Sequence, residues 1–207
     1  MSIVKLNNRG VRSATTFGSI SALGEISFIK KLTASSSSTI SFVDGTSDVV
    51  LDNTYKEYIF TYNNVHPSVD AAKFLFQGNA AGGSGYNETI TSTFFYGYHA
   101  EADDEAGKAY YGGGDQGQGT AFQRLGSGGP GTDNDQSASG YLHLFNPSST
   151  TFVKHFIATN STYQNSDDVN HNFIAGYFNT TSAIDEIQFK FDSGNIDAGD
   201  ICLYGIK

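Results

Sequence analysis

Histidines are the first residues of this 207-residue sequence to consider for chemistry, because imidazole is a common metal ligand. Five are present, and His143 and His155 lie on either side of a turn at Pro147, where a hairpin would bring them close together. His171 is the third ligand to consider. No further ligand follows at a fixed spacing. We therefore predict that these histidines bind no metal.

Acidic residues form two clusters that raise the question of calcium, because Ca²⁺ prefers several oxygen ligands. They are the run Glu101 to Glu105 and the triplet Asp133 to Asp135. The triplet lacks the glycine and the closing glutamate of an EF-hand loop. Charged runs in loops are normally solvated, so we expect neither cluster to bind an ion. We predict no metal and no cofactor for the chain.

The common catalytic patterns are missing from the sequence. Glu57, Glu88 and Glu101 are candidates for the carboxylate pair of a glycosidase, but nothing selects two of them. No G-x-S-x-G elbow is present, and no Gly-Lys-Ser/Thr follows the glycine-rich tracts. We predict no catalytic residue and no enzymatic activity, and a glycan-degrading enzyme stays as a third hypothesis behind the two developed below.

Aromatic side chains offer another kind of contact, because they can stack on sugars. The chain has 16 Phe and 12 Tyr. Phe94, Phe95 and Tyr96 lie in a strand-like run, for which we expect core packing. Tyr110 and Tyr111 lie in a polar segment instead, so we name these two tyrosines as candidate glycan contacts.

Short alternating apolar segments, separated by turn residues, run from Glu25 to the end of the chain and show no helical period. We expect strands at 26–30, 39–43, 55–62, 73–77, 89–98, 141–145, 151–158, 172–178, 187–191 and 201–206. About ten such strands predict an all-β fold, a β-sandwich of the jelly-roll type. The apolar run at the C-terminus predicts that the last element is paired inside a sheet.

Two segments depart from this strand pattern. Residues 1–24 show no period, and we expect an extended N-terminal arm ahead of a single domain at 25–207. Residues 99–139 form a long Gly-rich insertion, which we predict to be a functional loop with at most a short helix at 121–125.

The charge distribution limits the partners. The chain has 12 basic and 21 acidic residues, a net charge of −9, which argues against nucleic-acid binding. The first 31 residues contain five basic residues against one acidic residue, so the arm is suited to docking on an acidic neighbour. We name Lys5, Arg9, Arg12 and Phe17 as candidate assembly contacts.

A single cysteine, Cys202, rules out a disulfide within this sequence, and we expect it to be a small buried side chain. The sequence contains no run of 18 apolar residues, so it predicts no membrane span. The first residues lack the apolar stretch of a secretory signal peptide, so we expect synthesis in a cytoplasm.

Three stretches resemble recurring segments in virion structural proteins of marine tailed phages, including cyanophages. They are Gly24 to Gly45 (GEISFIKKLTASSSSTISFVDG), Leu142 to Phe156 (LHLFNPSSTTFVKHF) and Ile184 to Ile206. The resemblance implies a non-enzymatic component of a phage particle, either a capsid decoration protein or part of a tail or fibre appendage. It would be made in the bacterial host cytoplasm and located in the virion.

The resemblance also implies the partners. We expect other virion proteins, namely capsid or tail subunits, and a homo-oligomer with a trimer as the favoured arrangement. The alternative is a glycan-binding β-sandwich module that adheres to a host-surface glycan through Tyr110 and Tyr111. A large apolar subunit interface would favour the first hypothesis, and an open aromatic platform on one monomer would favour the second.

Overall fold

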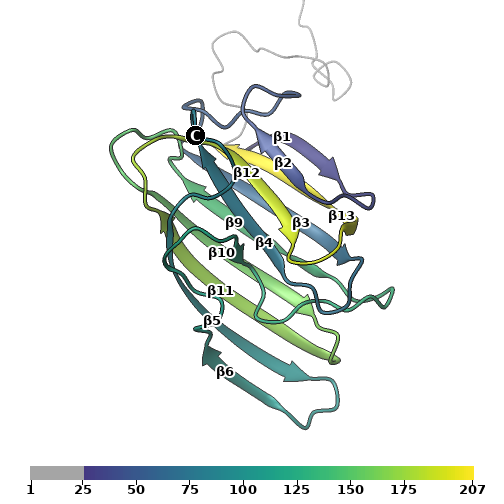
Figure 1. Cartoon of the computed structure of the whole chain (residues 1–207). Helices are drawn as coiled ribbons and strands as arrows, with labels where there is room; N and C mark the ends of the chain where they lie inside the picture. The colour runs from purple at the N-terminus through teal and green to yellow at the C-terminus, as the bar shows by residue number, and fades with distance from the viewer. Residues whose placement is uncertain (1–25) are drawn as a thin grey trace, which may run out of the picture.

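A computed structural model describes residues 26–207, and these residues fold entirely into strands, turns and loops (Figure 1). The strands are β1 (Ile26–Thr33), β2 (Ile40–Val43), β3 (Glu57–Pro67), β4 (Phe74–Ala80), β5 (Ile90–Ala100), β6 (Ala106–Tyr110), β7 (Gly117–Gly119), β8 (Gln123–Arg124), β9 (Ala138–Phe145), β10 (Lys154–Tyr163), β11 (Asp168–Phe178), β12 (Ile184–Phe191) and β13 (Ile196–Ile206). The predicted all-β fold is confirmed. The described part of the chain has no helix that could cross a membrane.

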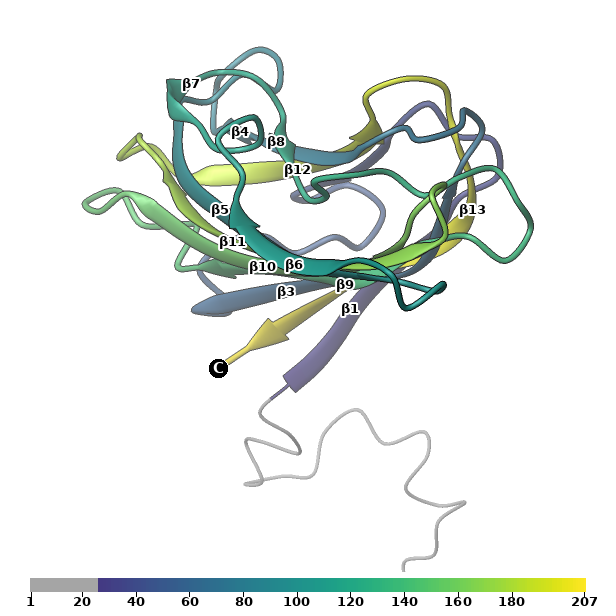
Figure 2. The same ribbon diagram turned by 90° about the horizontal axis from the view of Figure 1, so that it is seen from below.

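The strands form two antiparallel sheets that pack face to face (Figure 2). The large sheet has nine strands in the order β1-β13-β3-β9-β10-β11-β5-β6, with β7 also pairing with β5. The small sheet has four, in the order β2-β12-β4-β8, and lies over the concave side of the large sheet. The predicted β-sandwich is thus confirmed, whereas its jelly-roll connectivity stays a prediction.

Aromatic side chains fill the space between the two sheets. Ile187, Phe189 and Phe191 alternate along β12 with partly exposed residues, and all three are buried, as a period of two requires. The Phe189 ring stacks on Phe74 with 5.7 Å between centroids and lies 5.6 Å from Phe60. These contacts join β12 and β4 of the small sheet to β3 of the large one and so define the core.

The C-terminal strand β13 lies inside the large sheet, between β1 and β3, as predicted. Cys202 on this strand is buried and free, which confirms the expectation of a small buried side chain.

The insertion at 99–139 is only partly a loop, because it contains β6, β7 and β8. The segment 121–125 is extended rather than helical. Gln123 and Arg124 form β8, which pairs with the otherwise free edge of β4. The buried amide of Gln123 also accepts a hydrogen bond from Ser92 Oγ at 2.7 Å. Edge pairing and this buried contact outweigh any local helical tendency.

The inner face of the large sheet changes character beyond the small sheet. Asn160 on β10 and Asn170 and Asn172 on β11 point inward and are buried. The Gly-rich segment after β8 covers them with polar contacts: Ser127 N donates to Asn172 Oδ1 at 2.9 Å, and Ser127 Oγ donates to Asn170 Oδ1 at 2.8 Å. Past this segment, part of the inner face of β5 and β11 stays open.

Candidate ligand-binding site

A pocket of about 300 Å³ opens on this uncovered part of the inner face. We call it the tyrosine pocket. Its lining residues are Tyr96, Tyr98, Glu105, Tyr111, Ser127, Gly128, Gln164, Asp168 and Asn170. They come from β5, the β5–β6 turn, the segments after β6 and β8, and the region where β10 turns into β11. Five parts of the chain therefore converge on one concavity.

Three tyrosine rings form the aromatic wall of the tyrosine pocket. Tyr96 and Tyr98 are two residues apart on β5, so both side chains point to the inner face. Their ring centroids lie 6.0 Å apart, and Tyr111 stands edge-on to Tyr96 at 5.9 Å. Tyr111 reaches this position because its N–H donates to the carbonyl of Phe94 at 2.7 Å, directly after β6.

Two glycines make room for these rings. A Cβ at Gly107 on β6 would lie 3.0 Å from Cε1 of Tyr98, so the Tyr98 ring lies directly against this edge strand. A Cβ at Gly114 would lie 2.5 Å from Cδ1 of Tyr111 and 2.6 Å from Cδ1 of Phe94. The orientation of Tyr98 and Tyr111 therefore depends on the absence of a side chain at Gly107 and Gly114.

Two carboxylates, Glu105 and Asp168, also line the tyrosine pocket. The Tyr98 hydroxyl donates a hydrogen bond to Glu105 Oε1 at 3.1 Å, and this hydrogen bond raises the pKa of Tyr98. Asp168 accepts hydrogen bonds from Gln164 Nε2 at 2.6 Å and from Ser166 Oγ at 2.9 Å. Hydrogen bonds to both oxygens hold the Asp168 carboxylate in a fixed orientation.

A buried amide completes the pocket. Asn170 is only 2% exposed, and its Oδ1 accepts the hydrogen bond from Ser127. Its Nδ2 donates to no atom within residues 26–207, although Asn170 lines the pocket. The amide nitrogen is not shut off from solvent, so it can donate a hydrogen bond to water or to a ligand in the pocket. Aromatic faces, carboxylates and an amide donor together suit a small polar ligand with an apolar face.

The other side of the large sheet, which we call the outer face, has a different chemistry. Paired residues along it are Phe28, Tyr204, Ile59, His143, Ile157, Ala175 and Thr93, one from each of seven neighbouring strands. The exposed large apolar side chains of this face are Ile26, Phe28, Phe95, Tyr110, Tyr141, Ile157 and Val169. No described residue covers them, so apolar side chains are exposed on strands from one edge of the sheet to the other, with polar residues such as His143 and Thr93 between them.

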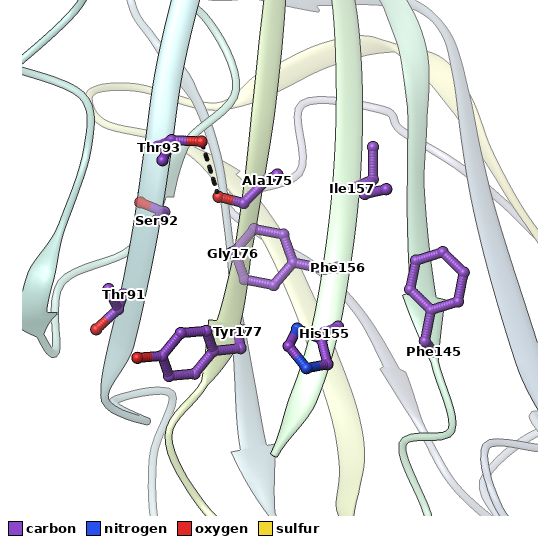
Figure 3. Close-up of a pocket in the computed structure, with 10 residues that line it drawn as sticks. All are labelled: Thr91, Ser92, Thr93, Phe145, His155, Phe156, Ile157, Ala175, Gly176 and Tyr177. Carbon is purple, nitrogen blue, oxygen red and sulfur yellow. Dashed lines mark hydrogen bonds between the residues drawn. The ribbon is translucent and has the colours of Figure 1, made fainter. Parts of the chain in front are cut away.

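Figure 3 shows a shallow depression in the outer face, about 480 Å³ in volume, where β9, β10, β11 and β5 lie side by side. Phe145, His155, Ile157 and Tyr177 surround it. Its lining is mostly apolar, and the hydroxyl of Thr93 is already directed to the carbonyl of Ala175 at 3.5 Å. This depression suits packing against another apolar surface better than the binding of a polar ligand.

The two tyrosines named from the sequence lie on opposite faces. Tyr111 lines the tyrosine pocket, whereas Tyr110 pairs with Phe95 on the outer face and is 58% exposed. Adjacent residues diverge in this way because successive side chains of an extended segment point to opposite faces, and Tyr111 still bonds to β5 through its N–H. The expectation of core packing holds for Phe94 and is wrong for Phe95, which is 51% exposed. Tyr96 is partly buried and packs against the core while it also lines the pocket.

The histidines and the other predicted residues lie elsewhere. His143 and His155 both point to the outer face, and His143 contacts Glu57 at 2.8 Å. Residues 26–207 contain no group of three or more His, Cys, Asp or Glu side chains that could hold a metal ion. The candidate assembly contacts Lys5, Arg9, Arg12 and Phe17 lie outside the described residues, as does the predicted arm.

Sequence reasoning missed most of the tyrosine pocket. Tyr96 and Tyr98 carried a usable signal, because two tyrosines at a spacing of two must share a face of a strand. No local pattern marked Glu105, Asp168 or Asn170 as pocket residues, because their proximity depends on which strands become neighbours.

The chain matches no protein-family model, no curated protein and no solved structure. Its function is therefore argued from the geometry and chemistry of its surfaces.

Proposed function

We propose that the protein is a non-enzymatic glycan-binding β-sandwich module that holds a sugar in the tyrosine pocket. The observation that carries the proposal is the convergence of three tyrosine rings, two carboxylates and a buried amide on one concavity. A pyranose has an apolar C–H face that stacks on aromatic rings and hydroxyls that hydrogen-bond to carboxylates and amides. This function suits adhesion to a host-surface glycan.

Binding without cleavage is the chemistry that fits the two carboxylates. Hydrolysis requires a general acid that stays protonated near neutral pH, which enzymes obtain by burying a carboxyl group in apolar surroundings. Glu105 is exposed, and Asp168 accepts hydrogen bonds from Gln164 and Ser166, so neither carboxyl group lies in apolar surroundings. Both groups are therefore suited to accepting hydrogen bonds from a ligand.

A glycan array tests this proposal. The full chain, its Tyr96→Ala variant and its Tyr110→Ala variant are applied to immobilised neutral, amino and acidic oligosaccharides. We expect binding by the full chain and by Tyr110→Ala, and strong loss in Tyr96→Ala. Mass spectrometry of a bound oligosaccharide after prolonged incubation should show an unchanged chain length. No binding to any glycan, or release of shortened products, would overturn the proposal.

As a second function we propose a structural role in a tailed-phage particle, as capsid decoration or part of a tail or fibre. The exposed apolar side chains of the outer face support it, because exposed apolar patches on soluble proteins often mark protein–protein interaction sites. Ile26 and Phe28, each 60% exposed, extend this surface to the edge strand that directly follows residues 1–25. The sequence resemblance points the same way, and the two functions are compatible in a particle component that binds receptors.

The mass of the protein in solution tests the structural role. We expect an oligomer, a trimer in the favoured arrangement, for the full chain. Removal of residues 1–24 should reduce it towards the monomer, and so should the double substitution Phe28→Ser and Ile157→Ser on the outer face. A full chain that stays monomeric at high concentration would count against self-assembly.

A further inference from the structure

Building on the proposed glycan-binding function, we propose that the tyrosine pocket selects sugars that carry a free ammonium group. The corresponding ligand class is an oligosaccharide of amino sugars that are not N-acetylated. This choice goes beyond glycan binding, because aromatic rings alone would accept neutral sugars equally well.

Two carboxylates without a cationic partner give the first reason. Glu105 and Asp168 both line the tyrosine pocket. The ion pairs formed within residues 26–207 join Lys31 to Asp200, His99 to Asp103 and His143 to Glu57, so neither pocket carboxylate is paired with a basic group there. An ammonium group would neutralise them, a neutral sugar would not, and a uronic acid would be repelled.

The three tyrosine rings give the second reason. A cation within about 6 Å of an aromatic centroid is attracted by the negative face of the ring, and cages of several rings recognise ammonium ligands. Tyr96, Tyr98 and Tyr111 line one cavity, and the Tyr96 centroid lies 6.0 Å from that of Tyr98 and 5.9 Å from that of Tyr111. The edge of an aromatic ring is positive and does not attract a cation. The ammonium group would therefore lie against the faces of the rings, within reach of the Glu105 carboxylate.

The charges around the tyrosine pocket point the same way. Glu101, Asp103 and Asp104 are exposed in the β5–β6 turn, and the backbone N–H of Glu101 donates to the carbonyl of Asp167 in the β10–β11 turn at 2.9 Å. These carboxylates adjoin the two pocket carboxylates in the chain and form an acidic surface that attracts cations towards the pocket.

Of the basic groups nearby, Arg124 contacts the wall of the pocket, whereas Lys108 and His99 point to the outer face. Arg124 donates a hydrogen bond from Nη1 to the hydroxyl of Tyr111 at 2.9 Å and is not part of the pocket lining. Lys108 pairs with Gly97 on β5, and both residues belong to the outer face. His99 lies on the outer side of β5, where its Nε2 contacts Asp103 at 3.1 Å.

Asn170 is an independent observation that favours a sugar over a bare cation. Its Nδ2 is a donor at the wall of the pocket and has no partner within residues 26–207. A metal ion cannot accept a hydrogen bond, whereas a sugar hydroxyl or ring oxygen can. A ligand that carries both a positive charge and acceptor oxygens would match this lining, and an amino sugar has both.

Calorimetric titration of the full chain with three tetrasaccharides tests this inference: β-1,4-linked glucosamine, its N-acetylated form and galacturonic acid. We expect the glucosamine tetramer to bind about tenfold more tightly than the N-acetylated form, and the acidic tetramer not to bind. Glu105→Gln keeps an acceptor for the Tyr98 hydroxyl but removes the charge, so it should lower affinity for the glucosamine tetramer about five- to tenfold. Because the amide oxygen that this substitution introduces can still accept a hydrogen bond, affinity for the N-acetylated tetramer should fall by no more than about twofold.

Asp104→Asn is the matched control, because Asp104 lies in the same turn, is exposed and does not line the pocket. Equal binding of the acetylated and free-amine tetramers would overturn the inference and leave glycan binding intact. Equal effects of Glu105→Gln and Asp104→Asn would mean that only a diffuse acidic surface attracts the amine, which also overturns it. Binding of none of the tetramers, combined with a blank glycan array, would overturn the inference and the proposed function together.

Discussion

The hydroxyl of Tyr111 accepts a hydrogen bond from Nη1 of Arg124 at 2.9 Å, and this bond joins the two sheets beside the tyrosine pocket. Arg124 lies on β8 in the small sheet, and Tyr111 directly follows β6 in the large sheet. The small sheet therefore helps to orient a ring that lines the pocket on the large one.

Substitutions at Tyr111 should separate the contribution of its ring from that of its hydroxyl. Tyr111→Phe keeps the ring and should raise the Kd for an oligosaccharide by about two- to fivefold. Tyr111→Ala removes the stacking surface and should raise the Kd about tenfold or more. Calorimetry on both variants measures the difference. Equal losses would show that the hydroxyl, rather than the ring, contacts the ligand.

Gly107→Ala should weaken binding without unfolding the protein. The new Cβ would lie 3.0 Å from Cε1 of Tyr98, so this partly exposed ring must move by a few tenths of an ångström. We expect a Kd about threefold higher and an unchanged midpoint of thermal unfolding. Gly112→Ala is the control, because a Cβ there meets nothing within 4 Å. An unchanged Kd for Gly107→Ala would mean that the position of Tyr98 is unimportant.

Gly114→Ala should instead lower stability. Its Cβ would meet Cδ1 of Phe94 at 2.6 Å, and Phe94 is fully buried, so the ring has little room to move. Overpacking of this kind costs about 1–3 kcal/mol, which urea unfolding would detect. With Gly112→Ala again as the reference, equal stability of the two variants would contradict the close packing seen here.

Alkaline pH should destabilise the fold through its buried tyrosines. Burial raises the pKa of Tyr58 to about 12, and burial raises that of Tyr62 further above its usual value of about 10. The native state therefore keeps tyrosine protons that the unfolded state releases, so stability present below about pH 10 is lost as the pH rises towards 12 and beyond. Burial lowers the pKa of Lys154, and this makes stability rise rather than fall with pH. The rise is complete by about pH 10.4, the usual pKa of lysine, so it does not offset the loss of stability above that pH.

Tyr62→Phe tests the alkaline effect. It removes the hydrogen bond from the Tyr62 hydroxyl to the carbonyl of Thr159, so the free energy of unfolding at pH 7 should fall by about 1 kcal/mol. Urea unfolding between pH 7 and pH 11 should show a shallower alkaline loss for the variant. Parallel curves for the two proteins would contradict a role for Tyr62 in the alkaline loss.

Local patterns in the sequence predicted the strands well, because alternation and turn residues act over a few positions. Ile187, Phe189 and Phe191 are buried on one side of β12 as their spacing requires, and Cys202 is buried on β13. The same rules failed at 121–125, where pairing with β4 sets the conformation. Tertiary context decides such short segments.

The candidate site was predictable only in part. Tyr111 was chosen because its surroundings are polar, but the same reasoning selected Tyr110, which points to the outer face. Distinguishing them requires the end of β6, which pairing with β5 determines. Asp168 and Asn170 reach the pocket because β11 lies beside β5, and no local pattern specifies that neighbour.

The most direct test of the central claim asks which face of the large sheet binds the glycan. Calorimetric titrations with the β-1,4-linked glucosamine tetramer and its N-acetylated form are compared for two double variants, Tyr96→Ala with Tyr111→Ala, and Tyr110→Ala with Tyr177→Ala. The first pair removes rings of the tyrosine pocket, and the second removes rings of the outer face. We predict at least about a hundredfold loss of affinity for the inner pair and less than about twofold for the outer pair. Loss of binding in the outer pair, with the inner pair unaffected, would contradict the account.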